Sequence, residues 1–240
     1  MLSKKQIKLI TSLKHKKYRQ EHQLFVVEGL KTINELLMSS LNLVQLFSTI
    51  PFNIDAKLET RITENELNKM SFLKSPNKAL AIFKTPPVCD IDYDNLIVAL
   101  DSINDPGNLG TIIRLCDWFG IKDLVCSKTT VDCYNPKVVQ ATMGSITRVN
   151  VTYTELDSFL DNTSNTVFGA FMDGSNVYNS QLNKKGILVL GNEANGISEV
   201  IGKKITNKIT IPRFGELQET ESLNVASAAA ILINEFKRSS

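Results

Sequence analysis

Five polar side chains in the second half of the chain could take part in chemistry, and they occur in three segments that each follow an apolar run. They are Asn108, Arg114, Glu193, Ser222 and Asn224. Amide, guanidinium, carboxylate and hydroxyl groups can bind sugar or phosphate oxygens, and they can stabilise charge that develops on an oxygen atom. Loops at strand ends commonly carry such groups in α/β proteins, so we expect the three segments to form one site.

The first segment, DSINDPGNLGTIIRLCDWFG at 101–120, directly follows the apolar run at 96–100. A helix is predicted over 108–119, which places Asn108 where free N–H groups can bind an anion. Arg114 follows on roughly the same side of this helix. The pattern indicates phosphate or ribose binding. The alternative is an N-cap asparagine followed by a solvent-facing arginine, because asparagine is a common N-cap.

The second segment, LVLGNEANGIS at 188–198, places Gly191 and Glu193 directly after a predicted strand. A glycine there lets a ligand approach the backbone, although a plain turn could have the same sequence. In the third segment, RFGELQETE at 213–221 separates a predicted strand from an alanine-rich helix predicted over 222–237. Small residues on that helix allow close approach of a ligand or a second subunit, and ordinary helix packing would also explain the alanines.

Several kinds of site are excluded or disfavoured by the residue types. Both histidines, His15 and His22, lie near the N-terminus, so the second half holds no Ser-His-Asp or Cys-His arrangement and no metal site is expected. GNLG lacks the GxGxxG spacing and no GK[ST] follows, which disfavours a dinucleotide-dependent oxidoreductase and excludes a P-loop. The four cysteines form no CxxC pair. Since nothing suggests a secretory signal, we expect reduced thiols in a cytoplasmic protein.

The chain has 240 residues, of which 42% are hydrophobic, so a sizeable core is expected. No apolar run approaches the roughly 20 residues that span a bilayer, and no membrane association is expected. The periodicity predicts two α/β domains, 1–88 and 93–240, separated by the Pro86-Pro87 stretch at 84–95. In the first domain the predicted helices are 3–19, 30–38 and one that begins with a Thr63–Glu66 capping box, and the predicted strands are 25–27, 43–47 and 80–83.

The second domain alternates strands and helices, which predicts a parallel sheet covered by helices. The predicted strands are 96–100, 123–126, 149–153, 166–170, 187–190 and 208–211, and the predicted helices are 108–119, 136–141, 155–161 and 222–237.

Together, the three segments resemble the sequence motifs of the SpoU (TrmH-type) RNA ribose 2′-O-methyltransferases of the SPOUT class. NDPGNLGTIIR is similar to the first motif, LGNEANGIS to the second and IPRFG…ESLNVASAAAIL to the third, in the family's order. The N-terminal part, with FVVEGLKTINELL, resembles the ribosomal-protein-like RNA-binding domain found in part of the family. The resemblance implies a parallel α/β domain with a C-terminal trefoil knot, one of the rare exceptions to unknotted chains, preceded by a smaller α/β RNA-binding domain.

The resemblance also implies a cofactor, partners and residue roles. S-adenosylmethionine would bind in the knot, and a homodimer would complete the site. As catalytic residues, Arg114 and Asn108 would contact the RNA, while Glu193, Ser222 and Asn224 would shape the site. The positions that the motifs assign to the cofactor are Leu190, Gly191, Ile211, Leu223 and Asn224.

The proposal for the family makes the first-motif arginine the general base. A guanidinium is a poor base near neutrality, so we favour an Arg114 that anchors a phosphate and stabilises developing alkoxide charge. One departure from the family is the loop at 213–221, which is longer than is usual and acidic. It could alter which RNA fits, or close over the cofactor.

The sequence therefore predicts a methyltransferase that acts on a ribose 2′-OH of structured RNA, ribosomal RNA first and transfer RNA second. The alternative is a catalytically inactive RNA-binding or assembly factor. Residues 1–20 hold seven Lys or Arg and no acid. We favour RNA contact for this stretch over the solvated face of an amphipathic helix or an organelle targeting peptide.

Overall fold

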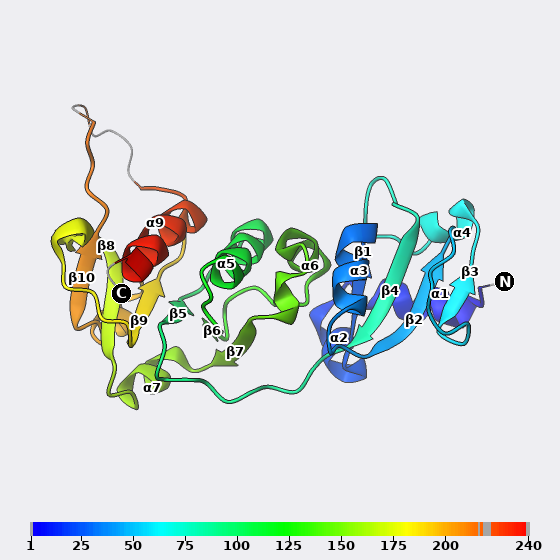
Figure 1. The fold of residues 1–240 in the computed structure, drawn as a ribbon, viewed down its shortest axis with the longest axis horizontal. Helices are drawn as coiled ribbons and strands as arrows, with labels where there is room; N and C mark the ends of the chain where they lie inside the picture. Colours follow the sequence, from blue (N-terminus) through cyan, green and yellow to red (C-terminus); the bar gives the residue numbers. More distant parts are fainter. Residues whose placement is uncertain (1, 216, 218–221, 239–240) are drawn as a thin grey trace. The chain divides into compact units, whose positions relative to one another are not determined.

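The computed structural model of the chain describes residues 2–215, 217 and 222–238 (Figure 1). Its contacts divide the chain into two compact units. The first unit is Met1–Pro87 with Asp132–Thr147, and the second is Val88–Val131 with Arg148–Ser240. Among the described residues, no helix combines the length and the apolar character needed to cross a bilayer.

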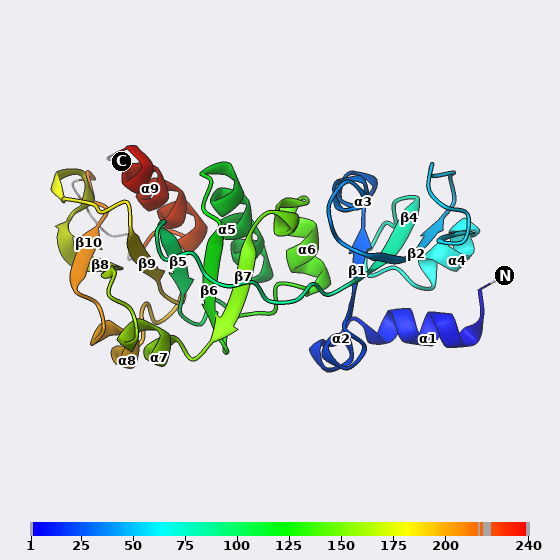
Figure 2. The ribbon, with the colours of Figure 1, turned by 60° about the horizontal axis from the view of Figure 1, so that its bottom comes forward.

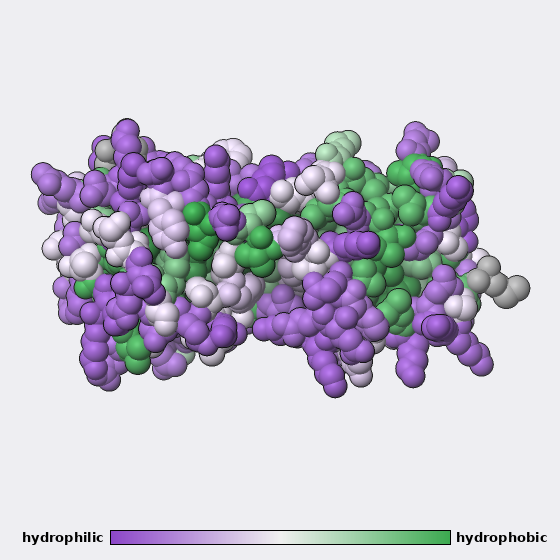
Figure 3. All heavy atoms as spheres, turned by 90° about the horizontal axis from the view of Figure 1, so that it is seen from below, coloured by the Kyte–Doolittle hydropathy of each residue, from purple (hydrophilic) through white to green (hydrophobic). Residues whose placement is uncertain are grey.

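The first unit is built on a four-stranded sheet. Its strands are β1 (Leu24–Glu28), β2 (Leu43–Ser48), β3 (Glu59–Arg61) and β4 (Ala79–Lys84), and its helices are α1 (Lys4–Ser12), α2 (Lys16–His22), α3 (Leu30–Leu37), α4 (Glu64–Asn68) and α6 (Pro136–Thr142). The strand order is β1-β4-β2-β3, with β4 antiparallel to both neighbours. Figure 2 shows α3 on one side of this sheet and α1 on the other, where Ile10 and Leu13 enter the core. On the face seen in Figure 3, the first unit also exposes a broad apolar area.

The N-terminal helix predicted over 3–19 is wrong, because the chain forms two helices with a break between them. The cause is Arg19, which is buried and donates from its guanidinium to the carbonyl oxygens of Leu13 and Lys14, each at 2.8 Å. These carbonyls lie just past the end of α1 and would lack partners if the helix stopped there without help. The capping box predicted at Thr63 is confirmed, since its hydroxyl accepts from the Glu66 N–H at 3.2 Å.

Residues 132–147 pack with the first unit, whereas the predicted division at 1–88 and 93–240 kept them in the second. The Asp132 carboxylate forms an ion pair with Arg19. The ring centroids of Tyr134 and Phe25 lie 4.7 Å apart. Gly144, at a φ of +100°, lies so close to the Glu35 side chain that an added Cβ would come within 2.7 Å of it. These long-range contacts have no signal in the local sequence pattern.

The second unit is built on a six-stranded, entirely parallel sheet with the order β10-β8-β9-β5-β6-β7. Its strands are β5 (Ile97–Leu100), β6 (Asp123–Ser127), β7 (Asn150–Thr154), β8 (Thr166–Asn176), β9 (Gly186–Leu190) and β10 (Asn207–Thr210), and its helices are α5 (Pro106–Trp118), α7 (Leu156–Asp161), α8 (Glu199–Gly202) and α9 (Val225–Arg238). Figure 2 shows α5 and α9 on one face of this sheet and α7 and α8 on the other. The parallel α/β architecture predicted from the alternating pattern is confirmed.

Four features of the second unit differ from the prediction. β8 continues to Asn176, beyond the predicted end at 170, and α8 was not predicted. α5 begins at Pro106, two residues early, because Asp105 is its N-cap. α9 begins at Val225 instead of 222. The last two differences arise because Asp105 caps α5 and Asn224 caps α9. These caps determine which polar side chains of the site remain available for other contacts.

Candidate active site

Three polar side chains from the three segments form one hydrogen-bonded chain. The Asn108 amide donates to the Glu193 carboxylate, with Nδ2 and Oε1 2.8 Å apart. The Asn224 amide donates to the Asn108 carbonyl oxygen, with Nδ2 and Oδ1 2.9 Å apart. Glu193 and Asn224 are exposed, and Asn108 is half-buried. The sequence predicted that the three loops meet, and the hydrogen bonds place their polar groups side by side.

Helix caps determine which way these amides point. Asp105 caps α5 by accepting from the backbone N–H of Asn108 at 2.8 Å, so the alternative in which Asn108 is the N-cap is wrong. The Asn108 side chain is therefore available to reach Glu193. Asn224 does act as a cap, because its Oδ1 accepts from Ala226 N at 2.9 Å and from Ser227 N at 3.3 Å. One amide oxygen thus orders α9, while the Nδ2 of the same residue orients Asn108.

Arg114 lies on the exposed side of α5, almost two turns beyond Asn108. Within the part of the chain that the structure describes, its guanidinium makes no hydrogen bond or ion pair. Its positive charge is therefore not neutralised by a carboxylate of that part. The neighbouring thiol on the helix, Cys116, is no candidate nucleophile, because burial raises its pKa to about 12.

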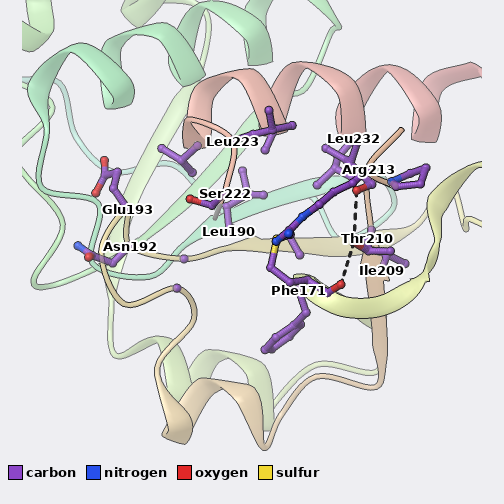
Figure 4. A pocket seen from close by; sticks show the side chains of 18 of the residues that line it. Phe171, Leu190, Asn192, Glu193, Ile209, Thr210, Arg213, Ser222, Leu223 and Leu232 are labelled. Carbon is purple, nitrogen blue, oxygen red and sulfur yellow. Dashed lines mark hydrogen bonds between the residues drawn. The ribbon is translucent and has the colours of Figure 1, made fainter. Parts of the chain in front are cut away.

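A cavity of about 1020 Å³ opens beside this polar chain, at the carboxyl ends of β9 and β10 and against the middle of β8. Figure 4 shows Glu193 and Asn192 at one end of it, Phe171 and Thr210 at the other, and Leu190 between them. Of the residues predicted for the site, those that line the cavity are Leu190, Gly191, Glu193, Ile211, Ser222 and Leu223. Asn108, Arg114 and Asn224 are not among its lining residues, so the cavity and the polar chain share Glu193.

The lining of the cavity fits a cofactor that has a flat apolar part and polar groups. Phe214 and Leu217 are each 83% exposed and Leu223 is 50% exposed, so apolar surface is available for an aromatic ring to cover. Residues 190–193 and 209–213, which follow or end β9 and β10, line the walls. These are the features that the motif positions require of an S-adenosylmethionine site.

The loop after β9 is folded too tightly for a side chain at its first position. A Cβ added to Gly191 would lie 2.1 Å from the backbone of Gly196, so only glycine is possible there. Asn192 and Gly196 pair across the loop, with N–O distances of 2.8 Å in both directions. Gly196 has a φ of +67°, which also favours glycine. The glycine at 191 is thus required by packing within the loop, and the plain-turn alternative explains part of this motif.

Sequence reasoning missed one wall of the cavity. Phe171 and Met172 line it from the extension of β8 beyond the predicted strand end. The Met172 carbonyl accepts from the Thr210 hydroxyl at 3.4 Å, drawn dashed in Figure 4, which ties this wall to β10. No motif marks these residues, although the alternation of the strand could have been followed further.

Two further predictions concern the surroundings of the site. Most of the acidic part of the long loop, Glu216 and residues 218–221, lies outside the described residues. Within the described ranges, no group of three His, Cys, Asp or Glu side chains is placed to hold a metal ion.

Comparison with known proteins agrees with this geometry. Residues 95–234 match the SpoU rRNA Methylase family, and residues 4–81 match the MRM3-like substrate binding domain. The chain is 28% identical over 231 residues to the 23S rRNA (guanosine(2553)-2'-O)-methyltransferase RlmP of Bacillus subtilis. The aligned region covers 92% of each protein.

Two solved structures superpose over nearly the whole chain. A TrmH-family protein from Porphyromonas gingivalis has a TM-score of 0.87 and 36% identity, with 100% of each chain covered. The AdoMet-bound rRNA methyltransferase from Sinorhizobium meliloti has a TM-score of 0.87 and 26% identity, covering 99% of this chain and 96% of that one. The resemblance predicted from the motifs is therefore confirmed: the chain belongs to the SpoU (TrmH) family of RNA methylases.

Proposed function

We propose that this protein transfers a methyl group from S-adenosylmethionine to a ribose 2′-hydroxyl of ribosomal RNA. The observation that carries the proposal is the hydrogen-bonded chain Glu193–Asn108–Asn224 at the edge of a cavity with an apolar lining. S-adenosylmethionine supplies a methyl group on a sulfonium, which is already a good leaving group. The protein must therefore mainly orient the hydroxyl and assist the loss of its proton.

The chain's own residues have distinct tasks in this proposal. Leu190, Gly191, Ile211 and Leu223 would hold the cofactor through backbone groups and apolar contact. Arg114 would bind the phosphate next to the target ribose and stabilise charge on its 2′-oxygen. Its exposed guanidinium, which has no counterion among the described residues, supports this task. The chain from Glu193 to Asn224 would fix the groups that surround the ribose, with Ser222 at the cavity wall.

The first unit supplies the contact with RNA. α1 exposes Lys4, Lys5 and Lys8 without an acidic residue in its first turn, and such lysines bind phosphates in a salt-dependent way. The 23S rRNA activity named for the Bacillus subtilis relative favours ribosomal over transfer RNA. The presence of all five polar residues of the motifs disfavours an inactive RNA-binding factor.

We also propose that the enzyme acts as a homodimer in the cytoplasm, and that its C-terminal segment forms the family's trefoil knot. Trp118, near the end of α5, exposes 84% of its surface, which supports contact with a second copy. The four cysteines are present as thiols, which supports a reducing compartment. Sedimentation at several protein concentrations tests the dimer.

The proposed activity is tested first by calorimetric titration with S-adenosylmethionine and, separately, with NADH. Binding of S-adenosylmethionine alone is expected. Purified protein is then incubated with labelled S-adenosylmethionine and either ribosomal or transfer RNA, and the nucleosides are analysed by mass spectrometry. A 2′-O-methylated nucleoside from ribosomal RNA is expected. Binding of RNA without methyl transfer at saturating cofactor would favour the inactive factor, and NADH binding would overturn the proposal.

A further inference from the structure

A buried carboxylate, Asp101, lies between two loops of the candidate site. It directly follows β5 and is only 5% exposed. Its Oδ2 accepts from the backbone N–H of Ser198 at 2.8 Å, and its own N–H donates to the Leu190 carbonyl at 2.9 Å. Asp101 therefore joins the loop that leads to Asn108 with both ends of the loop that carries Glu193.

The next residue, Ser102, is held in a conformation that few residues other than glycine adopt. Its φ is +60°. Each of its polar groups is engaged: its N–H donates to the Ser127 hydroxyl at 2.9 Å, its carbonyl accepts from the Asn192 amide at 2.7 Å, and its hydroxyl donates to Asp101 Oδ1 at 3.1 Å. Backbone strain of this kind persists only where the surroundings determine it. The turn after β5 is thus fixed by the loop after β9.

We propose that Asp101 is a positioning residue, which clamps the loop at 191–198 onto the turn after β5 and so sets Glu193 against Asn108. The proposal rests on the proposed function. Glu193 is exposed and Asn108 is half-buried, and the 2.8 Å hydrogen bond between their side chains is open to solvent, so burial does little to hold it together. The two loops come from strands that are neighbours in the sheet, but strand pairing ends at Leu100 and Leu190. Beyond that point, the contacts made by Asp101 and Asn192 join the loops.

A second buried aspartate offers a matched control at the other end of the same sheet. Asp123 begins β6 and is 4% exposed. It accepts from the Asp92 N–H at 3.2 Å and from the Asn150 amide at 2.8 Å. Asp101 and Asp123 therefore share burial, hydrogen bonding through both carboxylate oxygens, and location in the second unit. They differ in that the contacts of Asp123 lie at the amino ends of the strands, away from the site.

The experiment compares Asp101→Ala, Asp101→Asn and Asp123→Ala as full-length proteins. Three quantities are measured: the melting temperature, hydrogen exchange of peptides that cover 191–198, and the kcat and KM of methyl transfer to RNA. Asp101→Ala is expected to speed exchange at 191–198 and to lower kcat by about 100-fold, as a misplacement of about 1 Å can do, with the KM for RNA changed little. Asp101→Asn keeps an oxygen that can accept from the Ser198 N–H. It is therefore expected to restore most of the slow exchange at 191–198 and most of kcat. Asp123→Ala is expected to lower the melting temperature by a similar amount and leave kcat within a few-fold of wild type.

The proposal is overturned if Asp101→Ala and Asp123→Ala lower kcat equally for equal losses of melting temperature. It is also overturned if exchange at 191–198 is unchanged in Asp101→Ala. Failure of the proposed function has a different signature, since the wild-type protein itself would then transfer no methyl group. The exchange comparison would still decide whether Asp101 holds the loop.

Discussion

The stability of the first unit is predicted to depend on one buried arginine, Arg19. It is 4% exposed, and its guanidinium donates to Asp132 Oδ2 from Nε at 2.9 Å and from Nη2 at 2.5 Å. The remaining nitrogen, Nη1, donates to the carbonyls of Leu13 and Lys14. Arg19→Ala would leave a carboxylate that is only 14% exposed without its cation, and two carbonyls without their donor.

Breaking a buried ion pair by removing one partner costs about 3–5 kcal/mol, and we expect about 3 kcal/mol here because Asp132 retains some contact with water. Arg19→Lys keeps the charge but cannot donate in three directions from a planar fork, so an intermediate loss is expected. The control is Lys78→Ala, which breaks the pair with Glu64 at 3.1 Å, where the side chains are 48% and 74% exposed. A loss of about 0.5 kcal/mol or less is expected for this surface pair.

The assay is equilibrium unfolding in urea followed by far-ultraviolet circular dichroism. Because two units need not unfold together, hydrogen exchange of β1 and β4 reports the first unit separately. The reasoning is refuted if Arg19→Ala lowers the free energy of unfolding of the first unit by less than about 1 kcal/mol, since the pair would then behave as an exposed one.

Three further predictions concern the site, the buried Glu28 and the RNA contact. Arg114→Ala is expected to lower methyl transfer by about 100-fold or more while the calorimetric Kd for S-adenosylmethionine stays nearly unchanged, because Arg114 does not line the cavity. Burial raises the pKa of Glu28, despite hydrogen bonds from Ser71 and Phe72, so its contribution to stability is present below the unfolded pKa and is lost as pH rises through the folded one. Glu28→Gln should therefore gain stability relative to wild type as pH rises from about 4.5 to 7, measured by urea unfolding. The affinity for RNA falls as salt rises, and replacing Lys4, Lys5 and Lys8 by Gln should make this dependence less steep. The magnitude of the slope of log K for RNA binding against log salt should decrease by about 2–3.

Each of these predictions has a control. Arg114→Lys retains the charge without the planar fork and should keep part of the activity. Wild-type turnover in Arg114→Ala would remove this residue from the mechanism. Glu28→Ala loses both hydrogen bonds and should be destabilised at every pH. If the stability of Glu28→Gln changed with pH in parallel with that of wild type, the raised pKa of Glu28 would be contradicted. Replacing Lys57, Lys69 and Lys74 by Gln changes the charge equally elsewhere on the first unit, and an equal drop in slope would show that α1 makes no special contact.

Much of the fold and the grouping of the site could be predicted from local patterns. Alternating apolar runs and helical periodicities predicted the parallel sheet, because the strand and helix periods are short-range properties of the chain. The capping box at Thr63 could be placed to the residue for the same reason. The convergence of Asn108, Glu193 and Asn224 followed from their positions after strands that end at one edge of the sheet.

The parts that could not be predicted depend on contacts between residues far apart in the chain. The break between α1 and α2 depends on Arg19, which looks in sequence like one more cation of a basic stretch. The packing of 132–147 with the first unit depends on Asp132 and Tyr134, which belong to no motif. The difference between Asn108 and Asn224 was equally hidden, since either asparagine could cap a helix and only the presence of Asp105 frees the first one.

The surroundings of Arg114 favour one of the two roles considered for it. A base must lose a proton before it can accept one, and a guanidinium is a poor base near neutrality. Arg114 lies exposed on α5, and among the described residues it has no carboxylate partner. The same surroundings favour an electrostatic role, because an uncompensated cation on a rigid helix attracts a phosphate and stabilises an alkoxide without having to reorganise. We therefore infer that Arg114 acts through its charge. Beyond His22, the chain has no histidine that could act as the base in place of Arg114.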